Sequence, residues 1–202
     1  KHWENVITKA LGVEPIRINS SLFSAQNRNR LYWTNLPIND YPKDLNILLK
    51  SILLQDVDFE NVGDALTVQK SLPKLQKKYG YIPKMFNAYN ISEITEKSPT
   101  LSLGSMVTSS CATTIFIQNE KGNYTVKNKK ININNNEYNT NLDDGKYILR
   151  KLTPRECERL QTLPENYTEG VSDSQRYKMI GNGWTVDAIK WILNHYPSEE
   201  EN

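Results

Sequence analysis

Three short blocks, one near the start of the chain and two near its end, constrain this protein more than any other feature of its sequence. The first, in residues 24–33, reads Ser-Ala-Gln-Asn-Arg-Asn-Arg-Leu-Tyr-Trp. The second, residues 152–161, contains a helix-start signature, and the third, residues 181–186, reads Gly-Asn-Gly-Trp-Thr-Val. Between the first and the second lies a long stretch of different composition, rich first in lysine, then in serine and threonine, then in asparagine. The order of these blocks therefore limits the possible folds and functions more than bulk composition does.

The chain has 202 residues, of which 38% are hydrophobic. This is enough to build a core, so we expect a globular fold. The two cysteines, Cys111 and Cys157, are too few for a disulfide framework and match no zinc spacing, so we expect no metal site. No apolar run is long enough to cross a bilayer, and no signal-peptide pattern opens the chain. We expect a cytoplasmic protein, encoded by a bacterium or a phage, and a fragment of something longer.

The net charge of +2 is too small to diagnose a nucleic-acid binder, but it is unevenly distributed. Residues 69–97 hold six lysines and two glutamates, and residues 121–151 hold seven basic and three acidic residues. Each stretch thus carries +4. From charge alone, a solvated lysine-rich face and a phosphate-binding surface stay equally open.

Hydrophobic periodicity and turn residues predict the local structure. Thr153-Pro154-Arg155-Glu156 has the residues of a capping box with proline in the first helical turn. We expect a mobile, low-complexity loop over the asparagine-rich residues 128–141. Helices are predicted over 1–11, 45–54, 69–79, from 153, over 172–180 and over 185–196, and strands over 15–18, 31–33, 113–117, 124–127 and 147–149.

Together the blocks resemble the last three signature blocks of the DNA cytosine-5 methyltransferases, in the family's order. Gln26, Arg28 and Arg30 match the block that opens with glutamine and carries an arginine pair. Residues 150–161 are similar to the ninth motif and residues 177–186 to the tenth. Trp184 stands where most bacterial members have valine, which is similar to the vertebrate de novo branch and its phage relatives.

The resemblance implies roles for particular residues. Arg28, Arg30 and Gln26 would be catalytic, with Arg30 held against the flipped cytosine. Asn182, Gly183 and Trp184 would bind the methyl donor S-adenosyl-L-methionine, although Trp184 could instead close the core. Residues 97–105 resemble the short element that enters the DNA groove, so the expected DNA contacts are Lys97, Thr100, Ser102 and Ser105.

The resemblance also implies the architecture. We expect the C-terminal portion of an α/β, class I (Rossmann-like) methyltransferase domain with an inserted mixed α+β target-recognition domain. Residues 1–36 would end the catalytic domain, 37–150 would form the target-recognition domain, 151–196 would return to the catalytic domain, and 197–202 would be a disordered tail. The arginine pair and the glycine-flanked turn, about 150 positions apart, should converge on one cavity.

What this chain lacks limits the expected function. The family's proline-cysteine nucleophile is absent, because Cys111 follows Ser110 and Cys157 follows Glu156. We treat Cys157 as a buried apolar residue. The chain is therefore predicted to read double-stranded DNA, contact the flipped cytosine and complete the donor pocket, and to need an N-terminal catalytic half. Two alternatives stay open: a separate recognition subunit of a split methyltransferase, and an inactive DNA-binding remnant.

Overall fold

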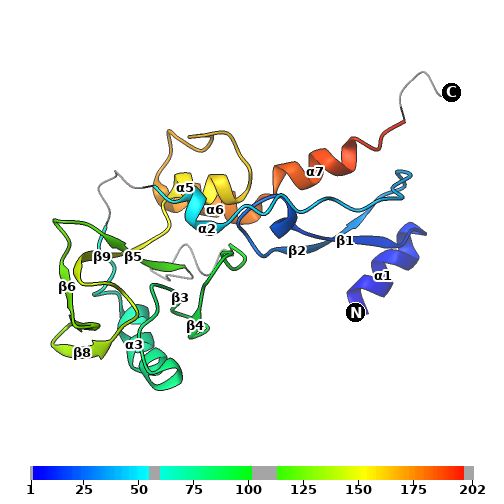
Figure 1. Ribbon diagram of the computed structural model, residues 1–202. Helices are drawn as coiled ribbons and strands as arrows, with labels where there is room; N and C mark the ends of the chain where they lie inside the picture. Colours follow the sequence, from blue (N-terminus) through cyan, green and yellow to red (C-terminus); the bar gives the residue numbers. More distant parts are fainter. Residues whose placement is uncertain (1, 55–59, 102–112, 198–202) are drawn as a thin grey trace.

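The computed structural model describes residues 2–54, 60–101 and 113–197, and places two β-sheets at opposite ends of an elongated molecule (Figure 1). Strands β1 (Pro15–Asn19) and β2 (Asn29–Trp33) form a two-stranded antiparallel sheet. The larger sheet is antiparallel, with the order β4-β3-β5-β9-β6-β7-β8. Its strands are β3 (Met85–Asn87), β4 (Ser92–Glu93), β5 (Thr114–Gln118), β6 (Tyr124–Lys127), β7 (Lys130–Ile133), β8 (Asn136–Asn139) and β9 (Gly145–Lys151).

Helices cover both faces of the larger sheet. Helix α3 (Leu66–Tyr79) packs on the face that includes Phe116 and Leu149. The opposite face, which includes Ile115 and Ile148, packs against α2 (Leu49–Ile52), α5 (Pro154–Leu160) and α6 (Asp173–Asn182). The last helix, α7 (Val186–Leu193), joins a third small core with β1 and β2. The middle helices therefore connect the two sheets.

Alternation along the strands explains this two-sided burial. In β5, Ile115 and Ile117 belong to one cluster of buried residues and Phe116 to the other. Successive side chains of a strand point to opposite faces, so a strand that is apolar at every position needs cover on both sides. The run Thr113 to Ile117 thus specifies a buried central strand, which agrees with the prediction apart from a shift of one residue at each end.

The asparagine-rich stretch is not a loop, contrary to our expectation. Residues 128–141 contain β7 and β8, joined to each other and to β6 by two tight turns. The central residues of both turns have positive φ: Asn128 at 53° and Lys129 at 60°, then Asn134 at 50° and Asn135 at 63°. Two-residue hairpin loops with positive φ at both positions favour asparagine, which tolerates that conformation. The asparagines therefore make turns.

The helix predicted over residues 45–54 shrinks to the four residues of α2. Long-range contacts take the backbone groups that such a helix would need. Leu45 N–H donates to the carbonyl of Leu22, and Leu49 N–H donates to that of Glu96. Asn46 also has a φ of 54°, which an α-helix excludes. Long-range backbone hydrogen bonds therefore prevail over the helical periodicity of this segment.

The other predicted elements are present with shifted ends. Helix α1 (His2–Leu11) ends at Gly12, which adopts a φ of 72°. Helix α3 begins three residues before the predicted start at Gln69 and ends at Gly80. Helix α6 continues two residues past Ile180, and α7 ends at Leu193, before the predicted Tyr196. The 3-10 turn η1 (Ser20–Leu22) and strands β3 and β4 were not predicted.

A buried ion pair fixes the end of β9 against helix α5. Both nitrogens of the Arg150 guanidinium fork contact Glu156, at 2.7 and 2.8 Å, and both side chains are almost wholly buried. Glu156 also completes the predicted capping box with Thr153 and accepts the Leu54 N–H at 2.8 Å. Because the carboxylate is shared by three segments, the pair sets the angle at which the large sheet meets the helices.

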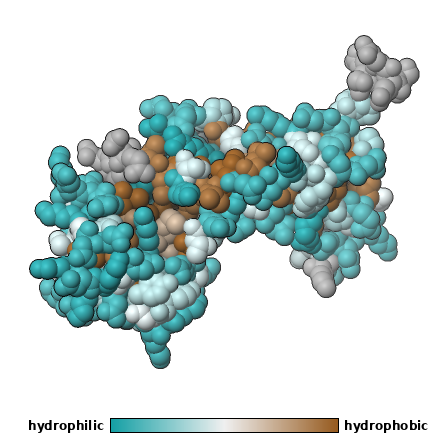
Figure 2. Space-filling view, in the orientation of Figure 1, coloured by the Kyte–Doolittle hydropathy of each residue, from teal (hydrophilic) through white to brown (hydrophobic). Residues whose placement is uncertain are grey.

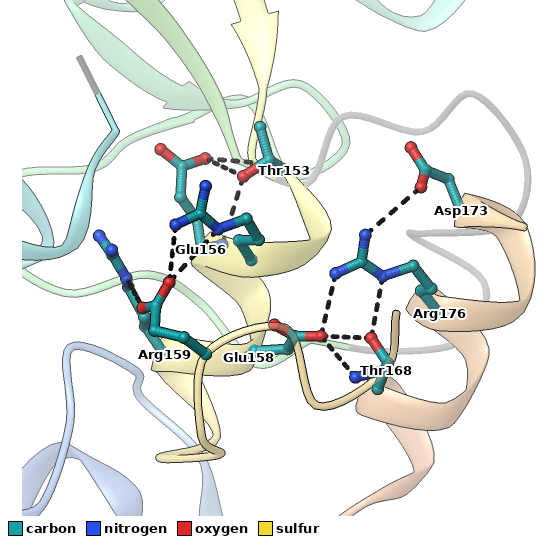
Figure 3. A network of polar contacts seen from close by, with 9 residues as sticks. Thr153, Glu156, Glu158, Arg159, Thr168, Asp173 and Arg176 are labelled. Carbon is teal, nitrogen blue, oxygen red and sulfur yellow. Dashed lines mark hydrogen bonds and ion pairs between the residues drawn. The ribbon is translucent and has the colours of Figure 1, made fainter. Parts of the chain in front are cut away.

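A second buried carboxylate joins α5 to α6 (Figure 3). Glu158 accepts hydrogen bonds from the backbone N–H and the hydroxyl of Thr168, and from Arg176 at 3.0 Å. Cys157, between the two glutamates, is buried as expected, and this burial raises the pKa of its thiol. Its burial among apolar neighbours supports a packing role.

We expect that replacing Arg150 by Ala costs about 3 to 5 kcal/mol of unfolding free energy, because Glu156 would be left as a buried, unpaired charge. Urea denaturation measures this loss. The matched control is Lys130→Ala, which breaks the half-exposed pair with Glu137 and should cost less than about 1 kcal/mol. Equal losses in the two variants would contradict this account of the junction.

Candidate functional site

The first block lies at the start of β2, and the structure gives its two arginines different surroundings. Arg30 is inside the strand, paired with Ile18 across the small sheet. Its side chain is exposed, and its guanidinium makes one hydrogen bond, to the carbonyl of Asn29 at 2.9 Å. Four of its five N–H donors therefore have no protein partner among the described residues. Arg30 could bind an anionic or keto oxygen from outside.

Arg28 is buried, with 5% of its surface exposed, and both terminal nitrogens of its guanidinium donate to backbone carbonyls, whereas its buried Nε has no partner among the described residues. It donates to Leu101 O at 2.8 Å, to Gly181 O at 3.2 Å and to Gly183 O at 3.0 Å. Burial, and then the nearby charge of Arg30, lower its pKa. Arg28 thus links the first block directly to the glycine-flanked turn. The expected convergence of these distant segments is present as this contact.

Gln26 is wholly buried, and neither its amide nitrogen nor its amide oxygen has a hydrogen-bond partner. Its backbone forms a parallel bridge with Ser98. A buried amide without partners is rare in folded proteins. In this arrangement the side chain cannot reach a base, so Arg30 is the member of the predicted catalytic set whose polar atoms are open to a ligand.

The segment that resembles the groove-entering element runs beside the first block. Ser98 N–H donates to Ala25 O at 2.7 Å, and Asn27 N–H donates to Ser98 O at 2.8 Å. The Thr100 hydroxyl donates to Asn27 O at 2.7 Å. These bonds anchor the base of the element on the arginine block. Ser102 and Ser105, two of the expected DNA contacts, lie outside the described residues.

Lys97 has a structural environment that sequence reasoning did not foresee. Its ammonium donates to the carbonyls of Ser21, Ser24 and Ile47 at 2.7 to 3.1 Å. An ammonium has three N–H donors, so none is left for the phosphate that we expected it to neutralise. Lys97 instead holds together the segments before and after the arginine block.

The third block joins α6 to α7. We expected Gly181 and Asn182 to lie in a turn, but they form the last residues of α6, and Gly183 caps the helix. Asn182 is exposed and its amide is open to a ligand, and Trp184 is 63% exposed. Neither glycine has a positive φ. A Cβ at Gly183 would lie 3.4 Å from the carbonyl oxygens of Met179 and Ile180, so the end of α6, and not the Arg28 contact, limits the space for a side chain there.

Gln161 supports this turn from inside, a role that the sequence analysis missed. Its amide nitrogen donates to Ile180 O at 2.9 Å, and its amide oxygen accepts the Thr185 hydroxyl at 2.9 Å. The Thr185 oxygen also lies 2.7 Å from the hydroxyl of Ser20. Gln161, Thr185 and Ser20 are each buried. A glutamine that closes the ninth motif, together with a threonine inside the tenth, is the signal that could have identified the pair.

An apolar groove of about 490 Å³ opens beside the turn. Figure 2 shows hydrophobic surface gathered across the middle of the molecule, between the two sheets. Arg28 and Arg30 do not line this groove, and one cavity shared by the arginine pair and the glycine-flanked turn stays a prediction. The lining residues are Leu163, Tyr167, Thr168, Met179, Ile180, Gly183, Trp184, Val186, Ile189, Lys190 and Leu193.

The described residues contain no group of three or more His, Cys, Asp or Glu side chains placed to hold a metal ion. None of the helices in the described ranges has the length and apolar character needed to cross a membrane.

Comparison with known proteins places the chain in a family context. Residues 13–197 match the family model of the C-5 cytosine-specific DNA methylases. An 84-residue segment is 41% identical to Type II methyltransferase M1.ScrFI of Lactococcus lactis subsp. cremoris, covering 37% of this chain and 22% of that protein. A 64-residue segment is 44% identical to the orphan methyltransferase M.Rho11sI of Bacillus phage rho11s, covering 27% of this chain and 13% of that protein.

The solved structure of the methyltransferase EhMeth from Entamoeba histolytica is similar in fold, with a TM-score of 0.56 at 11% sequence identity. That similarity covers 96% of this chain and 57% of EhMeth. The matched segments thus span less than a quarter of the length of these curated relatives, and the chain covers just over half of the solved structure. The mixed α/β architecture agrees with a methyltransferase fold.

We expect replacement of Arg28 and replacement of Arg30 to change the free energy of unfolding by different amounts. Arg28→Met would leave three buried carbonyls without their charged donor and should lower the unfolding free energy by about 2 to 4 kcal/mol. Arg30→Met, at an exposed site, should change it by less than about 0.5 kcal/mol. Chemical denaturation of both variants checks this, and a larger loss for Arg30→Met would reverse the assignment of their roles.

Proposed function

This chain belongs to the C-5 cytosine-specific DNA methylase family, and we propose that it is the C-terminal segment of a DNA (cytosine-5-)-methyltransferase. Its tasks are to recognise a short site in double-stranded DNA, to contact the flipped cytosine and to complete the S-adenosyl-L-methionine pocket. The whole enzyme transfers a methyl group to carbon 5 of cytosine. A single observation carries the proposal: an open Arg30 guanidinium lies on the same strand start as an Arg28 locked to the glycine-flanked turn.

Arg30 is the proposed catalytic residue of this segment. Attack of a thiolate on carbon 6 makes the cytosine ring electron-rich, and a guanidinium at the ring's keto oxygen stabilises that charge. A guanidinium offers a fixed fork of donors that suits a keto oxygen. Arg28 and Gln26, both buried, are positioning residues in this proposal, because their side chains are not accessible to the base.

The methyl-donor pocket is proposed to include Asn182, Gly183 and Trp184. S-adenosyl-L-methionine supplies a methyl group on a sulfonium and combines an apolar ring face with polar groups. The residues fit such a molecule, because the exposed Asn182 amide offers a donor and an acceptor beside the groove that Gly183 and Trp184 line. Gln161 and Arg28 would hold this turn in place.

Residues 37–150 are proposed to form the target-recognition domain, and the remainder to complete a catalytic domain with an N-terminal half. Two features support a further polypeptide segment against the small sheet. Helix α1 buries none of its residues and exposes Trp3 and Leu11 at 73% and 58%. A two-stranded sheet is also marginal without additional strands. Since the sequence holds no proline-cysteine pair, the nucleophile would come from that half, and this chain alone would not methylate DNA.

We predict that joining or co-expressing the chain with a family N-terminal half restores cytosine methylation. Arg30→Ala should then lower turnover at least about a hundredfold, because one stabilising donor set at the reacting ring is lost. Bisulfite sequencing of host DNA and a methyl-transfer assay measure this. The matched control is Arg17→Ala, an exposed arginine on the opposite face of the small sheet. Near-normal turnover of Arg30→Ala would remove the catalytic assignment.

We also predict that exchanging residues 69–145 for the equivalent segment of a relative changes which DNA sequence is methylated and leaves methyl transfer intact. The exchanged segment carries most of the large sheet, whereas Arg28, Arg30, Gln161 and the glycine-flanked turn stay in place. Bisulfite sequencing of the methylated sites shows the outcome. An unchanged target sequence in an active chimera would exclude a recognition role for this segment.

A further inference from the structure

The two basic stretches of equal charge differ in how their charges are used. In the second stretch, Lys129 contacts Asp143 at 2.8 Å, Lys130 contacts Glu137 at 2.7 Å and Arg150 is paired with Glu156. Lys151 also lies 3.5 Å from Glu60. Four of its seven basic residues are therefore ion-paired, and the three that have no ion pair among the described residues, Lys121, Lys127 and Lys146, lie on separate elements and not on one helix face.

The first stretch is arranged in the opposite way, on helix α3. The helix holds four lysines and no acidic residue. Its buried side, which includes Val68, Leu72 and Leu75, fixes its rotation against the core. At 100° per residue, the lysines then fall on the outward side, and all four are exposed. We call the group Lys70, Lys74 and Lys77 the α3 lysine ridge.

No carboxylate or carbonyl within the described ranges pairs with any lysine of the α3 lysine ridge, whereas Lys78, beside it, donates to Ile91 O at 2.9 Å. Like charges at i, i+4 destabilise a helix slightly, so the ridge is a small cost to the fold that no internal contact offsets. Lys77, in the last turn, gains from the helix dipole, but Lys70 and Lys74 lie before that turn. A binding partner would explain their uncompensated charge.

A groove of about 200 Å³ adjoins the ridge. Lys70 and Lys74 line one side with Thr67, and Tyr89, which is 52% exposed, lines the other. Charged donors facing a hydroxyl and an aromatic ring suit a phosphate-sugar backbone. The rise of an α-helix places Lys70 and Lys74 about 6 Å apart along its axis. Two phosphate steps of one DNA strand span about 7 Å along the duplex.

We propose that the α3 lysine ridge binds the phosphate backbone of duplex DNA that flanks the target site. This inference rests on the proposed function, because a methyltransferase segment that recognises DNA provides the polyanion. The contacts would carry no sequence information. They would add affinity and set the orientation of the large sheet on the duplex, while base recognition belongs to other parts of the segment.

The salt dependence of DNA binding tests the proposal. The 202-residue chain is titrated onto a fluorescent mixed-sequence duplex at about 50 to 200 mM salt, and the slope of log K against log salt is measured. The variant K70Q/K74Q/K77Q should bind more weakly at low salt and lower the slope by about 1 per lysine, about 3 in all. Thermal unfolding of each variant confirms that it is folded.

The matched control is K121Q/K127Q/K146Q, which removes the same charge from exposed positions of the second stretch. It should lower the slope by less than about 1 in total. Equal effects of the two triple variants would mean that net charge alone matters, and would overturn the proposal. Absence of duplex binding by the unaltered chain would overturn it as well.

Two further readouts separate this inference from others. Labelled polyglutamate is titrated in parallel, and dependence on the ridge for polyglutamate but not for DNA would indicate an acidic protein partner and refute the proposal. Methylation by the unaltered reconstituted enzyme is assayed in parallel at low salt with saturating DNA. Loss of methylation in the unaltered enzyme would contradict the proposed function. The difference in salt slope between the two triple variants would still test the present proposal independently.

Discussion

The buried guanidinium of Arg28 is the contact on which the arrangement of the site depends. It joins the residues just before β2 to Leu101, in the segment 97–105, and to Gly181 and Gly183 at the end of α6. The three carbonyls satisfy both terminal nitrogens of the guanidinium, which offsets much of the cost of burying it, although its Nε has no partner among the described residues. Segments some 150 positions apart in the chain are thereby held in one register.

The division of work between the two arginines follows from their burial. Arg28 gives its donors to the protein and is no longer available to a ligand, whereas Arg30, two positions on, remains open. The same logic applies to Lys97, whose ammonium is consumed by three carbonyls, and to Gln161, which braces the turn from within. The side chains around the site whose hydrogen bonds go to the protein hold its segments in place. The exposed side chains keep donors that can bind a ligand.

Local sequence was a good guide where one residue type serves one conformation. The capping box at Thr153 and Glu156, the glycine that ends α3 and the apolar run of β5 were all read correctly. Local sequence was misleading where a residue type is compatible with more than one conformation, or where long-range contacts take the backbone groups. Asparagine enrichment suggested a loop but supplies the positive-φ corners of two hairpins, and the periodic residues 45–54 lose most of their helix to long-range backbone pairing.

The sequence by itself determined the family, the order of the blocks, the residue types that can contact a base or a methyl donor, and the absence of a proline-cysteine pair. Only the tertiary structure decided which of these residues are free. Two stretches of identical net charge differ because four basic residues of one are ion-paired, two of them with Glu60 and Glu156 outside the stretch, whereas the exposed lysines of the other gather on one helix. Accessibility and pairing are properties of burial and long-range contact, and no local pattern encodes them.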